Sequence, residues 1–348
     1  MNDTYTREQE LRALRDLSAR LGRDPLLTQA SSGNISLKFD DSLWIKASGK
    51  WLCHADADDF LIHVRLARAR ACVSQHIPVP ETIASSPHTF TASIETAMHA
   101  VLPQAVVIHL HSVHTIACAV RDDAPAYLAA RLAGLNWLWI PYVPSGNFLA
   151  AEIASRLARS PGADVLILGN HGLVVCGSCC RSAESLLAVV EERLAIEPRP
   201  LPPLDLDRLT ASLDRSAWFL PASPEIHTLA ADPLSLRILS GGILYPCQAI
   251  FLPDILPAAD FAYPAILSLH KNTQPAARLL PGQGVFCRKE ITAAERQMLC
   301  GLAGIVRRLH EPARLRYLSA CEIEDVLGGE ISGYRLAADR NTPVGVLS

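Results

Sequence analysis

The sequence predicts an α/β protein built from two successive units. Helical and strand periodicities alternate along the first part of the chain, a stretch with four prolines at 197–207 interrupts them, and similar patterns resume beyond it. With 348 residues, 49% hydrophobic and 19% charged, the chain has enough apolar material for two hydrophobic cores. We therefore expect a first domain over 1–198 and a smaller α/β domain over 199–348.

The first predicted domain opens with a helix and a β-hairpin. Apolar residues recur at helical spacing and a glycine ends the series: Leu11, Leu14, Leu17, Leu21 and Gly22. Strands are predicted over 34–39 and 43–47, joined by a turn that contains two aspartates. Since the outer ends of a hairpin meet, we expect the glycine-containing loops 31–34 and 48–50 to lie side by side.

Further helices and strands follow in alternation. A helix that begins near Ser93 leads to the apolar run 105–120, and two strand segments within 163–177 are interrupted at Gly169 and Asn170. The later predicted elements are a helix over 181–196, strands within 236–252, and a strand followed by a helix within 282–310.

Charge and hydropathy exclude several classes of partner. A formal net charge of −3 without a basic block argues against nucleic acid or an anionic membrane. The start MNDTYTREQE lacks the basic and apolar segments of a secretory leader, and the apolar run 105–120 is interrupted by histidines and too short to cross a bilayer. We therefore expect a cytoplasmic protein that takes a small molecule and binds neither nucleic acid nor membrane.

Three histidines indicate a metal site. Side chains alternate along a strand, so His109 and His111 point to the same face, where two imidazoles about 7 Å apart can converge on one ion. His114 has the opposite parity if the strand continues, and we leave it outside the ligand set. His171, between a strand and a glycine, is the third candidate. The alternative is that each histidine taken singly is a hydrogen-bonded core residue.

The donor set favours zinc, although imidazole also suits nickel, cobalt, copper and iron. Three neutral imidazoles leave the ion its full charge, as a Lewis acid requires. The ten cysteines contain one C-x-x-C spacing, at Cys176 and Cys179 beside Cys180. A structural zinc site needs four ligands and no second pair lies nearby, so packing is the preferred interpretation of these cysteines.

Five motifs in order, "SSGNIS", "IKASGK", "SIETAMH", "VVIHLHSVH" and "LGNHGLVV", resemble the class II aldolase/adducin family, which includes fuculose- and rhamnulose-phosphate aldolases. The resemblance covers the chain from about Leu11 to Ile196. It implies a three-layer αβα domain with a central β-sheet, a zinc site made by His109, His111 and His171, and a glutamate that shuttles protons, here Glu95. Ring-like tetramers in the family imply a homo-oligomer.

The resemblance also implies a binding site for the substrate or its phosphate, formed by Gly33, Asn34, Ser48, Gly49 and Ser93. Glycine loops and a helix start offer backbone N–H groups to an anion, although these glycines are alternatively plain turns. Ile94 stands where sugar-phosphate aldolases commonly have a second serine, so one hydroxyl donor is missing. We therefore expect a site shifted away from phosphate.

The implied function is a zinc-dependent aldolase-type lyase of carbohydrate metabolism. It would cleave a carbon–carbon bond of a hydroxyketone or sugar, phosphorylated or not, through a metal-stabilised enediolate while Glu95 moves the proton. The alternatives are an epimerase, decarboxylase or dehydratase on the same fold, or a non-catalytic adducin-like binding protein. Tyr127 and Tyr142 are candidates for an acid supplied by a neighbouring subunit. The PGQG turn lacks a complete glycine fingerprint, so we expect no nicotinamide site in the second domain, whose role stays open.

Overall fold

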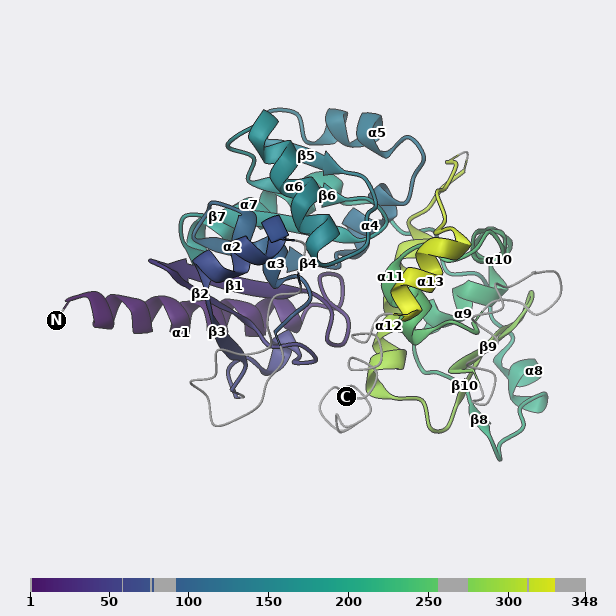
Figure 1. Ribbon diagram of the computed structural model, residues 1–348. Helices are drawn as coiled ribbons and strands as arrows, with labels where there is room; N and C mark the ends of the chain where they lie inside the picture. The colour runs from purple at the N-terminus through teal and green to yellow at the C-terminus, as the bar shows by residue number, and fades with distance from the viewer. Residues whose placement is uncertain are drawn as a thin grey trace. The chain divides into compact units, whose positions relative to one another are not determined.

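The structure is a computed structural model, and it describes residues 2–57, 59–75, 77, 92–255, 275–311 and 313–328. The chain divides into two compact units (Figure 1). The first comprises Met1–Ala119 and Asp123–Ala195, and the second comprises Val120–Asp122 and Ile196–Ser348. Each unit is described by itself below.

A seven-stranded sheet forms the centre of the first unit, in the order β3-β2-β1-β4-β7-β6-β5. Neighbouring strands are antiparallel except β5 and β6, which are parallel. The strands are β1 Asn34–Phe39, β2 Ser42–Lys46, β3 Leu61–Arg65, β4 Val106–Leu110, β5 Trp137–Ile140, β6 Val165–Leu168 and β7 Gly172–Gly177. Both β4 and β7 are fully buried, which explains why they are apolar on both faces in the sequence.

Helices cover both faces of this sheet (Figure 1). One layer holds α2 Leu66–Gln75, α3 Thr96–Val101 and α6 Asn147–Arg159, which contact one another. The other holds α1 Asn2–Gly22, α4 Val113–Ala119, α5 Ala124–Arg131 and α7 Cys180–Leu194, and a short 3-10 helix, Leu52–His54, contacts α1. Under α3 and α6 lie buried apolar side chains from both helices and the sheet, including Met98, Leu102, Val107, Leu149, Ile153, Leu166 and Val174. The predicted three-layer αβα fold is confirmed.

The hairpin of β1 and β2 places two loops next to each other, as predicted. Ser36 pairs with Ile45 in an antiparallel register, and the turn between the strands contains Asp40 at φ 51°. At the open end, Lys46 Nζ donates hydrogen bonds to the carbonyl oxygens of Ser31 at 3.0 Å and Lys50 at 2.6 Å. A buried ammonium group therefore ties the loop before β1 to the loop after β2.

The second unit is a smaller α/β unit with a three-stranded sheet in the order β8-β10-β9. Its elements are α8 Leu206–Ala211, β8 Trp218–Phe219, α9 Pro224–Ala231, α10 Pro233–Ser240, α11 Pro246–Phe251, β9 Ala277–Leu280, β10 Gly284–Arg288, α12 Ala293–Arg307 and α13 Ala320–Gly328. The strand and helix predicted within 282–310 are present as β10 and α12.

The strands predicted within 236–252 are wrong, because this stretch forms the end of α10 and the whole of α11. Each helix has a proline in its first turn, where the missing N–H costs nothing. The Asp232 side chain caps α10 by accepting hydrogen bonds from the N–H groups of Leu234 and Ser235. Pro233 and Pro246 therefore begin helices here, in a stretch whose apolar runs had predicted strands.

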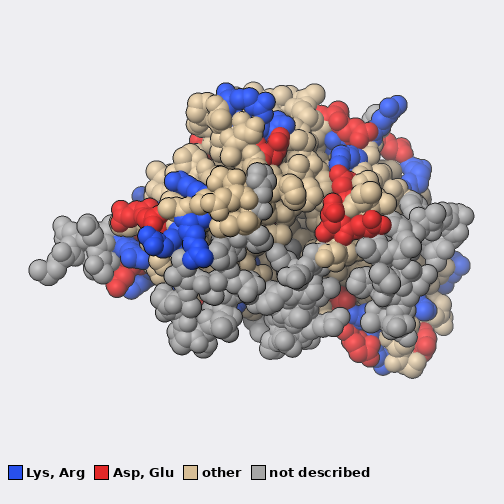
Figure 2. All heavy atoms as spheres, viewed as in Figure 1, with Lys and Arg blue, Asp and Glu red and all other residues tan. Residues whose placement is uncertain are grey.

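Basic and acidic side chains lie next to one another in several places on the face drawn in Figure 2. This mixture agrees with the small net charge of −3. In the part of the chain that the structure describes, no helix is both long and apolar enough to span a bilayer.

Candidate metal centre

Two neighbouring strands and a turn bring the three histidines together. His109 lies on β4, His111 follows the end of that strand, and His171 occupies the turn between β6 and β7. Because β4 pairs with β7, with His109 opposite Val174, the turn that carries His171 lies beside the end of β4. His171 is far from His109 and His111 along the chain, and this pairing brings it next to them.

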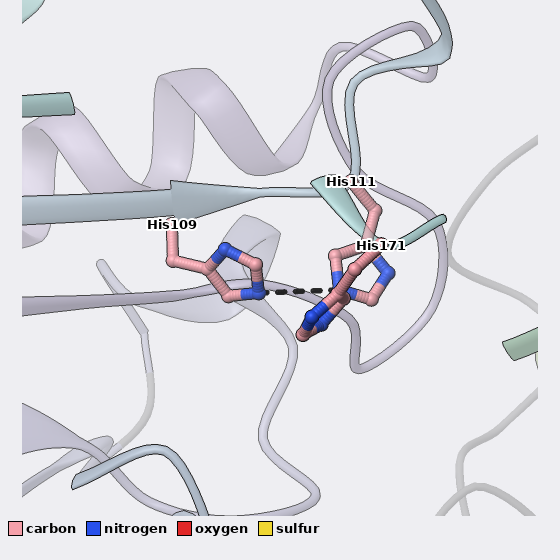
Figure 3. A group of neighbouring side chains, drawn as sticks. All are labelled: His109, His111 and His171. Carbon is pink, nitrogen blue, oxygen red and sulfur yellow. Dashed lines mark hydrogen bonds between the residues drawn. The ribbon is translucent and has the colours of Figure 1, made fainter. Parts of the chain in front are cut away.

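The histidine rings converge in the interior of the unit (Figure 3). Their centroids are 5.0 Å apart for His109 and His111, 4.9 Å for His109 and His171, and 5.1 Å for His111 and His171. One nitrogen from each ring lies within 4.8 Å of the others, and all three residues are buried. Among the described residues this is the group of histidine, cysteine, aspartate and glutamate side chains that could hold a metal ion.

The hydrogen bonds of His109 fit a metal ligand. Its Nδ1 lies 3.0 Å from the Leu173 carbonyl oxygen, so in the neutral ring Nδ1 carries the proton and Nε2 keeps a lone pair. That Nε2 is 3.2 Å from Nε2 of His111 (Figure 3). The lone pair of His109 Nε2 can accept from a protonated His111 Nε2 or bind a cation, so three such nitrogens within 4.8 Å of one another fit a divalent ion. The ligand roles stay a prediction.

His114 lies outside this cluster, on α4. The strand ends at Leu110 and the chain turns into a helix at Val113, so the alternation of the strand does not extend to His114. The three cysteines of the C-x-x-C region are also outside the cluster. Burial raises the pKa of the Cys176 and Cys180 thiols to about 12, as expected for packed neutral side chains.

Glu95 faces the histidines from the residue that precedes α3. Its Oε1 lies 3.4 Å from Nε2 of His109 and 3.2 Å from Nε2 of His171. Burial by itself raises the pKa of this carboxyl, but the charge and hydrogen bonds of His109 and His171 outweigh it and hold the pKa well below its usual range. A cation among these nitrogens, whether a proton or a metal ion, therefore favours the carboxylate form of Glu95.

Asn34 and Ser93 hold the other side of this carboxylate. Asn34 Nδ2 donates to Glu95 Oε2 at 2.6 Å and to Ser93 Oγ at 3.3 Å, and Ser93 Oγ also accepts from the Glu95 backbone N–H at 3.3 Å. Asn34 lies opposite His109 in the β1–β4 pairing, so both side chains are on the same face of the sheet. In the structure both predicted phosphate-binding residues contact Glu95, and their role toward phosphate stays a prediction.

The predicted glycine loops have the backbone geometry of turns. Gly33 and Gly49 have φ of +69° and +72°, a region that favours glycine. A Cβ at Gly33 would lie 2.7 Å from the His109 carbonyl oxygen, so this glycine also permits close approach of the loop to β4. Ser48 is half-buried in the turn before Gly49. Gly33, Ser48 and Gly49 lie at the open end of the hairpin, next to Asn34, which contacts Glu95.

Ile94 lies beside the start of α6. Its side chain packs toward Gly146, the residue before α6, where an added Cβ would lie 3.2 Å from Ile94 Cγ1.

Three residues near the site were not predicted from the sequence: Ser36, Lys46 and His99. The helical spacing of Glu95 and His99, and the strand spacing of Asn34 and Ser36, are the signals that could have indicated two of them.

Comparisons with known proteins give a consistent picture of the first unit. Residues 12–197 match the family model described as the class II aldolase and adducin N-terminal domain. A Bacillus subtilis protein named uncharacterized oxidoreductase YuxG is 27% identical over 191 residues, and an L-fuculose phosphate aldolase of Methanococcus vannielii is 28% identical over 165 residues. These alignments cover 49% and 47% of this chain, and 27% and 81% of the two relatives.

The chain thus spans only 27% of the length of the Bacillus subtilis relative. Among solved structures, the N-terminal class II aldolase domain of a conserved protein from Thermoplasma acidophilum aligns with 24% identity and a TM-score of 0.44. That alignment covers 52% of this chain and 90% of the Thermoplasma chain.

Proposed function

This chain belongs to the class II aldolase and adducin family, and from that premise we propose that its first unit is a metal-dependent lyase. It cleaves a carbon–carbon bond in a hydroxyketone or sugar. The observation that supports this most is the convergence of three buried imidazoles, two of which also lie within 3.4 Å of the Glu95 carboxylate. The role of the second unit is not part of this proposal.

His109, His111 and His171 would hold the divalent ion, with zinc the first expectation from three imidazole ligands. When bound, such an ion supplies Lewis-acid stabilisation of negative charge on substrate oxygen atoms. The Leu173 carbonyl orients the His109 ring by accepting from Nδ1. Burial of all three rings keeps bulk water from the ligand nitrogens, because His109, His111 and His171 are 0%, 3% and 5% exposed.

Glu95 is the base in this proposal. Its Oε1 faces the histidine nitrogens while Oε2 accepts from Asn34, so one oxygen is held and the other is directed at the reaction space. Accepting a proton from a substrate hydroxyl and returning it to carbon requires a carboxylate that starts ionised, the form that positive charge at His109 and His171 favours. The Ser93 hydroxyl limits rotation of the residue by accepting from its backbone N–H.

The substrate's anionic end, where it has one, would lie against the loops around Gly33 and Ser48 to Gly49. Backbone N–H groups of loops with positive φ are good anion ligands, and the buried ammonium of Lys46 adds positive charge under both loops. This site suits a phosphate or a carboxylate. By analogy with family members named as fuculose phosphate aldolases, we propose a small sugar or hydroxy acid and a homo-oligomer, expected to be a tetramer.

Metal content is the first test. Protein prepared without chelators should contain one divalent ion per chain by elemental analysis, and His109→Ala should lose it. A His63→Ala control, far along the sheet on β3, should retain it. Equal metal content in the wild type and His109→Ala would overturn the metal site and favour an adducin-like binding protein.

The second test is a screen of the metal-loaded protein with phosphorylated and unphosphorylated ketoses and hydroxy acids. Release of an aldehyde together with a smaller carbonyl compound identifies a lyase. Inversion at carbon, release of carbon dioxide or loss of water would instead identify epimerase, decarboxylase or dehydratase chemistry, which the same residues can support. Turnover of none of these substrates by fully metal-loaded protein would contradict the lyase proposal.

A further inference from the structure

A cluster of four polar side chains, Asn34, Ser36, Glu95 and His99, lies between β1 and α3 in an otherwise apolar interior. Asn34 and Ser36 are two residues apart on the strand and point to the same face, about 6.6 Å apart along it. Glu95 and His99 are four residues apart at the start of α3, about 6 Å apart along the helix axis. The two spacings match, so each strand residue lies opposite one helix residue.

Hydrogen bonds connect all four side chains. Asn34 Nδ2 donates to Glu95 Oε2 at 2.6 Å, and Ser36 Oγ lies 2.7 Å from His99 Nδ1. A third hydrogen bond joins His99 Nε2 to Asn34 Oδ1. His99 and Ser36 have no exposed surface and Asn34 is 3% exposed, so these groups have no bulk water to replace a lost partner.

The proton positions follow from the Asn34 amide. Its NH2 group faces Glu95 Oε2, and its Oδ1, which can only accept, faces His99 Nε2. His99 Nε2 must then carry a proton. Burial, followed by the positive charge of Lys38, holds the pKa of His99 well below its usual range, so the ring is neutral and Nδ1 accepts from the Ser36 hydroxyl. Ser36 thus donates to His99, His99 donates to Asn34, and Asn34 donates to Glu95.

We propose that His99 is a positioning residue for the base. Through its Nε2–H it fixes the Asn34 amide with the NH2 group toward Glu95, and this holds the carboxylate with Oε1 directed at His109 and His171. Ser36 in turn fixes the tautomer of His99. Without the Nε2–H donor the amide can turn over, and Oδ1 would then repel Glu95 Oε2. The catalytic part of this inference rests on the proposed function, whereas the positioning of Asn34 does not.

Three variants of His99 separate positioning from packing. His99→Gln keeps a donor at the end of the side chain, near the place of Nε2. His99→Asn is shorter and reaches only toward Ser36, and His99→Leu fills space without a donor. His63→Gln is the matched control, because His63 Nε2 bonds a serine hydroxyl, Ser42 Oγ at 2.9 Å, on strands β2 and β3 without any link to Asn34.

The first readout needs no substrate. In protein labelled with 15N-asparagine, the Asn34 side-chain NH2 resonances, assigned with Asn34→Asp, should be shifted downfield by the short bond to the carboxylate. We expect His99→Leu and His99→Asn to lose this shift and His99→Gln and His63→Gln to keep it. An unchanged Asn34 signal in His99→Leu overturns the proposal, as does a lost signal in His63→Gln. If His99→Leu does not fold, Ser36→Ala and His99→Asn are measured instead, and an unchanged Asn34 signal in both of them overturns the proposal.

The second readout applies once a substrate turns over. We expect kcat of His99→Leu and His99→Asn to fall about tenfold or more with KM and metal content unchanged, since a misplaced base slows proton transfer without changing binding. His99→Gln should recover most of kcat. Equal kcat in all variants overturns the catalytic role. Absence of turnover in the wild type contradicts the proposed function alone, and the Asn34 resonances still decide whether His99 positions the amide.

Discussion

The glycine after His171 is a position where one added methyl group should disrupt the metal centre. An ideal Cβ at Gly172 would lie 2.4 Å from the Leu110 carbonyl oxygen, and 3.4 Å from both His109 Cε1 and His111 Cδ2. The Leu110 carbonyl belongs to the backbone of β4 and cannot rotate away as a side chain can. Gly172→Ala should therefore push the turn that carries His171 away from the other two histidines.

The size of the effect follows from this overlap. A contact of 2.4 Å is about 1 Å shorter than the carbon–oxygen contacts of about 3.3 Å found between strands. Overpacking of this kind costs about 1–3 kcal/mol of unfolding free energy, or about 2–4 °C in Tm for each kcal/mol in a domain of this size. Displaced ligands and their supporting contacts typically weaken metal binding about 10–100-fold.

The assay is a zinc titration against a chromophoric chelator, combined with thermal unfolding, for the wild type, Gly172→Ala and Gly162→Ala. Gly162 has φ of +96° and an added Cβ there would meet no heavy atom within 4 Å, so alanine strains the backbone without touching the site. We expect Gly162→Ala to lose stability and keep wild-type zinc affinity. Wild-type zinc affinity in Gly172→Ala, or equal weakening in Gly162→Ala, would refute the reasoning.

Three further predictions concern the base, the sheet and the substrate. Glu95→Gln should keep its metal while turnover falls about a hundredfold or more, the scale of general acid–base catalysis; full activity would make Glu95 a structural residue. Burial lowers the pKa of Lys38 from 10.5 to about 8, which corresponds to about 3 kcal/mol against the charged form. This loss of folding free energy is complete below pH 8 and disappears as pH rises toward 10.5. Lys38→Met should therefore be more stable than the wild type at pH 7, and the difference in unfolding free energy between them should shrink by pH 10. Denaturant unfolding at both pH values checks this, and a constant difference would contradict it. Because Ile94 provides no hydroxyl, unphosphorylated substrates should turn over at least as well as their phosphorylated counterparts in steady-state assays; a strong preference for phosphorylated ketoses would show that inference to be wrong.

Local patterns in the sequence were sufficient for much of the first unit. The hairpin of β1 and β2 was predictable because strand alternation and the turn at Asp40 are properties of neighbouring residues. The shared direction of His109 and His111 was predicted from the same alternation, and His111 lies one residue beyond the end of β4. In the second unit, short apolar runs are compatible with a strand or a buried helix, so Pro233 and Pro246 were needed to recognise α10 and α11 as helices.

By itself, then, the sequence predicted the opening helix, the β1–β2 hairpin and the strands around Gly169, the neighbouring pair His109 and His111 and, through a resemblance, the remaining residues of the candidate site. Only the tertiary structure decided that the turn of His171 lies beside the end of β4, since this depends on the pairing of β4 with β7. Only the packing of α3 on β1 decided that His99 and Ser36 support Asn34 and Glu95. The physical reason is that hydrogen bonds between distant segments depend on how buried faces pack, and the periodicity of either segment alone contains no information about its partner.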